Sequence, residues 1–199
     1  MRVVVLFSGG KDSTYALHYA QQQGFEVVCL LNVVSRNRES YMYHTLNSDR
    51  VPEQARAIGV RLYQLKTEGV KEEEVEDLKK MLKKLKLEEG IEGVVSGALA
   101  SDYQKTRIER ICDDLDLASI TPMWHVNPEA YMRAVIDAGF DVRIAGVFAD
   151  GLDDSWIGKK IDEATVQRLR RLNIHIAGEG GEYETMVVDG PEFKMSLKF

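Results

Sequence analysis

The first half of the sequence alternates short apolar runs with longer segments in which apolar residues recur at helical spacing. The apolar runs lie near residues 3–7, 27–33, 60–65 and 93–97. Short strands separated by amphipathic helices are typical of a parallel sheet. We therefore predict an α/β fold, with helices on both faces of a parallel sheet. A chain of 199 residues has room for one such domain and a smaller lobe, but not for two large domains.

The character of the sequence changes near residues 122–126. Beyond this point we expect two helices and several short strands joined by glycines, with Asn127 capping the first helix and a proline in its first turn. We therefore predict a larger α/β domain over residues 1–123 and a smaller C-terminal α+β lobe over residues 124–199.

Residues 34–48 show no apolar period and are expected to form a long loop after the second strand. Loops of this length at a strand end usually serve function. His44 in this loop is a candidate for nucleotide binding, although packing explains a lone histidine beside tyrosines equally well. Ser48 is expected to cap the next helix, which should end near Ile58.

Charge and cysteine content exclude several classes of protein. The formal net charge is −6, so the surface as a whole is not built to neutralise nucleic-acid phosphates, and no nucleic-acid partner is expected. The two cysteines, Cys29 and Cys112, both lie in apolar periodic segments, which predicts buried thiols in a reducing compartment. No apolar run approaches the ~20 residues that span a bilayer. We therefore expect a cytoplasmic protein.

A glycine-rich hexapeptide follows the first strand directly and reads Ser8-Gly9-Gly10-Lys11-Asp12-Ser13. If a helix begins near Ser13, the free backbone N–H groups of its first turn form an anion site. The two serines add hydroxyl donors, and Lys11 adds a positive charge. An acid beside a phosphate is repulsive unless a divalent cation stands between them, so we assign Asp12 to Mg²⁺.

Two common nucleotide-binding motifs are absent here, because the loop matches neither GxxxxGK[ST] nor GxGxxG. The hexapeptide instead resembles the loop of the PP-loop ATP pyrophosphatases, a superfamily with a HUP-like fold that cleaves ATP to AMP and pyrophosphate. The resemblance implies ATP and Mg²⁺ as cofactors, and Lys11 and Asp12 as catalytic groups. It also implies that adenine lies against the main chain around Asn32. Gly97 ends a strand where a side chain would collide with the ribose, although a plain turn glycine is the alternative.

Three further segments, residues 40–45, 97–109 and 179–185, are similar to the diphthine-ammonia ligase family. The last of them, EGGEYET, is the most specific. The resemblance implies ATP-dependent amidation of diphthine, the modified histidine of elongation factor 2. Its partners are then that factor and ammonia, and its products are diphthamide, AMP and pyrophosphate.

Residues in these segments provide candidates for the remaining roles. Arg107 is expected to contact a second phosphate, in preference to forming an ion pair with Glu109. If residues 182–184 are extended, Glu182 and Glu184 face the same side. Carboxylates and aromatic rings suit the trimethylammonium group of diphthine, although a hairpin with exposed acids would look the same. The candidates for substrate binding are Tyr103, Gln104, Glu179, Glu182, Tyr183 and Glu184.

Two other functions fit the first half of the chain. The same loop chemistry could modify tRNA or a small-molecule carboxylate. A non-catalytic module that senses ATP would also keep the loop, but would show no turnover. The sequence leaves open the oligomeric state, a homodimer included, and the identity of any general base.

Overall fold

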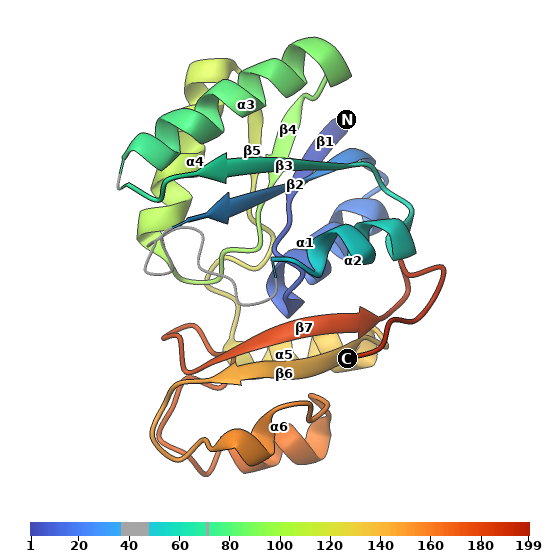
Figure 1. Ribbon diagram of the computed structural model, residues 1–199, viewed down its shortest axis with the longest axis vertical. Helices are drawn as coiled ribbons and strands as arrows, with labels where there is room; N and C mark the ends of the chain where they lie inside the picture. Colours follow the sequence, from blue (N-terminus) through green and yellow to red (C-terminus); the bar gives the residue numbers. More distant parts are fainter. Residues whose placement is uncertain (37–47, 71) are drawn as a thin grey trace.

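The computed structural model describes residues 1–36, 48–70 and 72–199, and it contains two sheets (Figure 1). The strands are β1 (Arg2–Leu6), β2 (Glu26–Ser35), β3 (Leu62–Thr67), β4 (Gly93–Val95), β5 (Ala118–Ile120), β6 (Asp141–Val147) and β7 (Tyr183–Asp189). The helices are α1 (Lys11–Gln22), α2 (Val51–Ile58), α3 (Glu73–Glu89), α4 (Asp102–Leu115), α5 (Pro128–Asp137), α6 (Glu163–Leu169) and the short 3₁₀ helix η1 (Asp154–Trp156).

The larger sheet has the strand order β3-β2-β1-β4-β5, and all its pairs are parallel. This confirms the predicted α/β parallel sheet. The chain crosses from one half of the sheet to the other between β3 and β4, so β1 and β4 are neighbours whose following loops diverge. Ligands of such sheets bind in the crevice where these loops separate. The glycine-rich hexapeptide forms the loop after β1 and the first turn of α1, which begins at Lys11.

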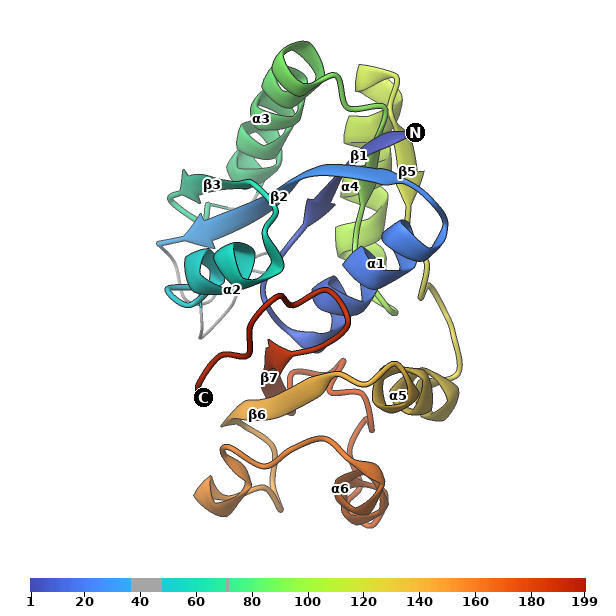
Figure 2. The ribbon, with the colours of Figure 1, turned by 90° about the vertical axis from the view of Figure 1, so that its right-hand side faces the viewer.

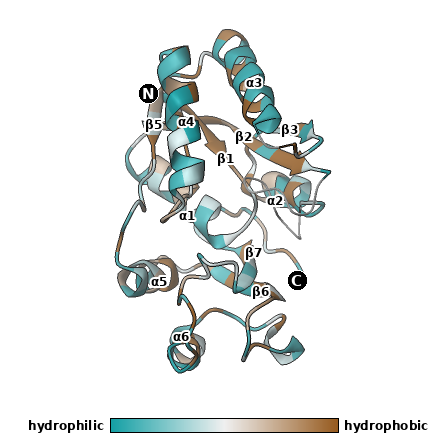
Figure 3. Cartoon of the chain, turned by 90° about the vertical axis from the view of Figure 1, so that its left-hand side faces the viewer, coloured by the Kyte–Doolittle hydropathy of each residue, from teal (hydrophilic) through white to brown (hydrophobic). Residues whose placement is uncertain are grey.

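Helices cover both faces of this sheet, as predicted, with α1 and α2 on one side and α3 and α4 on the other (Figure 2). The alternation of side chains along the strands accounts for the arrangement. Val3 and Val5 join the core that includes α1 and α2, whereas Val4 and Cys29 join the core formed with α3 and α4. Figure 3 shows the corresponding hydrophobic strands between helices with hydrophilic outer surfaces. Cys29 and Cys112 are buried free thiols, which confirms their predicted state.

The C-terminal part of the chain packs against the α1 side of the large sheet. Its strands β6 and β7 form an antiparallel pair, with α5 and α6 beside them (Figures 1 and 2). Residues of α5, β6 and β7 belong to the same apolar cluster as residues of α1 and β1. The two sheets therefore share one core. Across the part of the chain that the structure describes, no helix combines the length and hydropathy of a membrane span.

Two local predictions can be compared with the observed helix caps. Asn127 caps α5 as expected, because its side chain accepts hydrogen bonds from Glu129 N at 3.0 Å and Ala130 N at 3.1 Å. The predicted cap at Ser48 is wrong, since α2 begins at Val51 with Arg50 as its N-cap. Pro52 explains the shift: it lacks an N–H group and its fixed φ favours the first helical turn.

Candidate functional site

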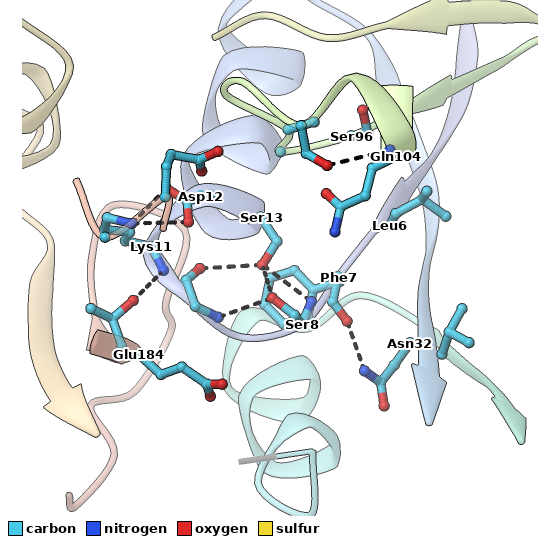
Figure 4. A pocket seen from close by; sticks show the side chains of 18 of the residues that line it. Leu6, Phe7, Ser8, Lys11, Asp12, Ser13, Asn32, Ser96, Gln104 and Glu184 are labelled. Carbon is cyan, nitrogen blue, oxygen red and sulfur yellow. Dashed lines mark hydrogen bonds and ion pairs between the residues drawn. The ribbon is translucent and has the colours of Figure 1, made fainter. Parts of the chain in front are cut away.

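A cavity of about 450 Å³ opens at the carboxyl edge of the parallel sheet, next to β7 (Figure 4). A volume in this range suits a small-molecule ligand. Its lining comes from β1 and the following loop (Leu6, Phe7, Ser8, Gly10, Lys11, Asp12, Ser13), from β2 (Leu31, Asn32, Val33), from β4 to α4 (Ser96, Gly97, Ala98, Ser101, Gln104, Ile108) and from the C-terminal lobe (Gly178, Glu179, Gly181, Tyr183, Glu184, Thr185). The cavity therefore brings the loop after β1 together with the acidic segment, which we define as residues 179–185.

The turn between β1 and α1 depends on a glycine in the left-handed region. Gly9 has a φ of +82°, and a Cβ atom added there would lie 2.0 Å from Gln54 Oε1. Gln54 is buried in α2, and its Nε2 donates to the carbonyl groups of Gly9 and Val187, at 2.8 Å in each case. A helix and a strand distant in sequence thus hold the turn. Gln54 was missed, although a glutamine on the apolar face of a short helix is a usable signal.

The hydroxyl groups of the loop bond to one another. Ser13 Oγ accepts a hydrogen bond from Ser8 N and lies 3.2 Å from Ser8 Oγ. It also lies 3.2 Å from the Gly10 carbonyl, to which it donates. The two serines therefore shape the turn, and both also line the cavity.

Lys11 and Asp12 form a pair at the start of α1. The Lys11 side chain is almost buried, and its Nζ lies 2.9 Å from Asp12 Oδ1 and 3.0 Å from Oδ2. Tyr131 of α5 donates its hydroxyl hydrogen to Asp12 Oδ1 at 2.6 Å. Burial raises the pKa of Tyr131 well above its ordinary value, and the negative charge of Asp12 adds to this effect, so the hydroxyl stays a donor.

The N-terminus of α1 receives its cap from the C-terminal lobe. Gly10 occupies the N-cap position and has no side chain to accept a hydrogen bond. Thr185 Oγ1 instead accepts the hydrogen bond of Lys11 N at 3.1 Å. The roles of Thr185 and Tyr131 were both missed, because each acts on a residue more than 100 positions away in the chain.

The β2 wall of the cavity contains the residues expected near adenine. Asn32 is buried, and its Nδ2 donates to the Phe7 carbonyl at 3.0 Å, while its Oδ1 accepts from Gln64 Nε2 at 3.2 Å. The Asn32 side chain therefore links β2 to the end of β1 and to β3. This leaves the main chain and the neighbouring apolar side chains as the surface that a base can contact.

Gly97 lines the cavity where β4 approaches α1. A Cβ atom at this position would lie 2.7 Å from the carbonyl carbon of Asp12 and 2.8 Å from Ser13 N. Real Cβ atoms do not approach backbone this closely, so the close approach of α1 already requires glycine. The predicted collision with a ribose is not needed to explain this residue.

Three residues of the acidic segment that we predicted to bind substrate line the cavity: Glu179, Tyr183 and Glu184. Glu179 Oε2 accepts a hydrogen bond from Ala100 N at 3.2 Å. Burial raises the pKa of Glu179, the charge of Asp12 raises it further, and Lys11 opposes the shift. Tyr183 is buried and donates its hydroxyl hydrogen to the Ile176 carbonyl at 2.6 Å, so the hydroxyl hydrogen is already occupied within the lobe.

Glu182 is placed differently from its prediction. Its carboxylate accepts hydrogen bonds from His175 N and Gly180 N, both at 2.8 Å, and it does not line the cavity. The expectation that Glu182 and Glu184 share a face required an extended backbone. The residues before Tyr183 form a turn instead, with Gly181 at a φ of +79°, and β7 begins only at Tyr183.

The candidates of α4 separate onto two rows of the helix. Gln104 lines the cavity with Ile108, four residues further on. Tyr103 and Arg107 form the neighbouring row and do not line it. Arg107 stacks 3.4 Å from the centre of the Tyr103 ring and pairs with Glu72, its Nε lying 3.1 Å from Oε1.

This placement does not support the predicted phosphate contact of Arg107. The alternative ion pair with Glu109 is not formed either, because Lys105 pairs with that carboxylate. His44 lies outside the residues that the structure describes. Within the described ranges, no three His, Cys, Asp or Glu side chains gather as a metal cluster.

Comparison with known proteins identifies the family. The model of the diphthamide synthase N-terminal domain matches residues 1–119, and that of the diphthamide synthase C-terminal domain matches residues 127–199. The chain belongs to the diphthamide synthase family. This confirms the resemblance drawn from the loop after β1 and from the acidic segment.

Curated members of the diphthamide synthase family match nearly the whole chain. The diphthine–ammonia ligase of Homo sapiens is 35% identical and that of Rattus norvegicus 36% identical, each over 99% of this chain and 82% of the relative. A solved structure, a predicted subunit of tRNA methyltransferase from Methanocaldococcus jannaschii, has a TM-score of 0.48 and 16% identity over 96% of this chain and 98% of that one. That structural likeness is too distant to indicate a function.

Proposed function

We propose that this protein is a diphthine–ammonia ligase, which uses ATP to convert the carboxylate of diphthine on elongation factor 2 into an amide. The products are diphthamide, AMP and pyrophosphate. One observation carries the proposal: a single cavity is lined by both the loop after β1 and the acidic segment, so a nucleotide and a second substrate can meet there. The names of its relatives support the same reaction.

ATP fits this cavity with its phosphates at the start of α1. The positive end of the helix and the Lys11 ammonium group face that region, and both stabilise negative charge. The adenine would lie against the main chain of Asn32, as the PP-loop resemblance implies. Gly97 also lines the cavity and has no side chain that would occupy its space.

The reaction then needs two transfers. The diphthine carboxylate attacks the α-phosphorus of ATP, the bond to the β-phosphate breaks, and pyrophosphate leaves beside Lys11. Ammonia next attacks the acyl carbon, and AMP leaves with the bonding electron pair. Positioning and charge stabilisation drive steps of this kind, so few side chains need to react themselves.

Asp12 is suited to hold Mg²⁺. Its side chain is 31% exposed and lines the cavity next to the proposed phosphate position. Mg²⁺ commonly takes one or two carboxylates and completes its shell with substrate phosphates and water, so a cluster of three acids is not required. When bound, the ion would neutralise charge on the pyrophosphate.

The acidic segment would receive the modified histidine. Glu184 provides negative charge and Tyr183 provides a ring, a combination that suits a trimethylammonium group. Glu179 lines the same cavity and remains for the second substrate, ammonia. This function would assign nucleotide binding mainly to residues 1–123 and substrate recognition to residues 124–199. It would also place the enzyme in the cytoplasm, where elongation factor 2 acts.

The test is an assay with labelled ATP, an ammonium salt and diphthine-bearing elongation factor 2. We expect AMP and pyrophosphate to form in step with the amide, which mass spectrometry of the factor measures. ADP as the product would exclude this chemistry. AMP formation driven by tRNA, but not by the factor, would favour the alternative tRNA-modifying activity. Tight ATP binding without turnover would favour a sensing module.

A further inference from the structure

The acidic groups in and around the cavity differ in how their oxygens are occupied. Both oxygens of Asp12 contact Lys11 Nζ, and one also accepts from Tyr131. Both oxygens of Glu182 accept backbone N–H groups. In Glu179 only Oε2 is used, by Ala100 N, and Oε1 has no hydrogen bond to any residue that the structure describes.

Glu179 belongs to the C-terminal lobe, but it lies in the same cavity as the loop after β1. It lines the cavity together with Lys11 and Asp12, and its carboxyl group interacts electrostatically with both. Tyr131 and Glu182 are its other ionisable neighbours, and its own N–H donates to His175 Nδ1 at 3.4 Å. A small cation held at Oε1 would therefore lie beside the proposed leaving groups.

We propose that Glu179 binds ammonium through Oε1 and accepts the proton that the nitrogen must lose before it can attack. The inference rests on the proposed function and supplies the base that this reaction requires. Ammonium has no lone pair, so it cannot act as a nucleophile until one N–H bond is broken. A carboxylate within hydrogen-bond distance is a suitable acceptor.

Ammonium gives one proton to Glu179 and becomes ammonia, whose lone pair attacks the acyl carbon of the adenylate. The C–N bond forms, and the C–O bond to AMP breaks with its electron pair on AMP. The nitrogen loses a second proton to water, which leaves a neutral amide. Glu179 then returns its own proton to water.

The burial of Glu179 fits this role. Burial raises the pKa of its carboxyl group, whereas an exposed glutamate is a weaker base. A general base is most efficient when its pKa approaches the working pH. The shift therefore moves Glu179 in the direction that proton transfer needs.

The decisive experiment compares two nucleophiles in the Glu179→Gln variant. Glutamine keeps an oxygen for Ala100 N but cannot take a proton. Hydroxylamine is a neutral amine at neutral pH, so it attacks an acyl adenylate without prior deprotonation and gives a hydroxamate. We expect amide formation from ammonium to fall roughly 100-fold or more. Hydroxamate formation and ATP–pyrophosphate exchange, which reports adenylation alone, should stay close to wild type.

Two further variants serve as controls. Glu179→Asp retains a proton acceptor and should restore part of the ammonium-dependent rate. Glu184→Gln removes another cavity carboxylate, and any loss it causes should affect both nucleophiles in parallel.

Equal loss with ammonium and hydroxylamine in Glu179→Gln would overturn the assignment of Glu179, and so would loss of exchange or an unchanged amide rate. Absence of exchange in the wild-type protein would instead refute the proposed function itself. The two failures are therefore distinguishable.

Discussion

Replacing Tyr131 with phenylalanine tests whether the C-terminal lobe positions Asp12. The variant removes one hydroxyl group and keeps the buried ring, which is 2% exposed. That hydroxyl donates to a carboxylate at 2.6 Å, and a hydrogen bond to a charged group contributes about 1.5–3 kcal/mol. Asp12 retains Lys11 Nζ at 2.9 Å and partial access to water, so part of this contribution is recovered.

We therefore expect Tyr131→Phe to lose about 1–2 kcal/mol of unfolding free energy, which corresponds to roughly 2–8 °C in Tm for a chain of this size. AMP formation should fall about tenfold, because Asp12 loses the contact that fixes its orientation. Urea denaturation and the labelled-ATP assay measure the two effects.

Tyr15→Phe is the matched control. Its ring packs edge-on against Tyr131 with the centroids 5.6 Å apart, but its hydroxyl makes no hydrogen bond to a described residue. The change should cost less than about 0.5 kcal/mol. If the two variants were equally stable and equally active, the hydrogen bond to Asp12 would have no positioning role.

The other predictions use single side chains. Lys11→Ala should lower AMP formation by roughly 100-fold or more, since it removes the charge beside the leaving pyrophosphate; residual turnover near wild type would exclude that role. Glu182→Ala should weaken use of the protein substrate more than ATP binding, because it opens the turn that carries the acidic segment, and equal losses in titration calorimetry would contradict this. Gly97→Ala should destabilise the protein by about 1–3 kcal/mol, since its Cβ would collide with the start of α1, and an unchanged urea midpoint would be inconsistent with that contact. Burial raises the pKa of Cys29 to about 12 and that of Cys112 to about 11. The folded state favours the neutral thiols, so their contribution to the free energy of unfolding is complete below the ordinary thiol pKa and is lost as pH rises toward the raised pKa values. A disulfide reagent at pH 8 should therefore label both cysteines only in urea.

The sheet and its helices could be predicted because each depends on neighbouring residues. Val3 and Val5 belong to one core and Val4 belongs to the other. In the sequence these residues form a continuous apolar run, which is typical of a strand that is buried on both faces. The turn at Gly9 could be predicted for the same reason, because it depends on adjacent residues of the glycine-rich hexapeptide. The cap at Ser48 failed where two local signals competed, since Pro52 determined the start of the helix.

The contacts that complete the site could not be predicted, because they join residues distant in the sequence. Thr185 caps Lys11, and Tyr131 binds Asp12, yet neither residue has a local pattern that indicates its partner. For Arg107 the sequence suggested a contact that the structure does not support. Its place in a matching segment suggested a phosphate contact, but the helix period assigns it to the row that faces Glu72.

These contacts change how the acidic segment should be understood. The sequence suggested a division of labour, in which the loop after β1 provides the energy and the distant acidic segment selects the substrate. In the structure a single segment has three tasks: Thr185 caps the helix that carries the loop, Glu182 closes the turn, and Glu179 faces the cavity. Docking of β7 therefore shapes the proposed ATP site as well as the substrate side. It follows that variants within the segment should separate by residue, with changes at Thr185 weakening ATP binding and changes at Glu179 sparing it.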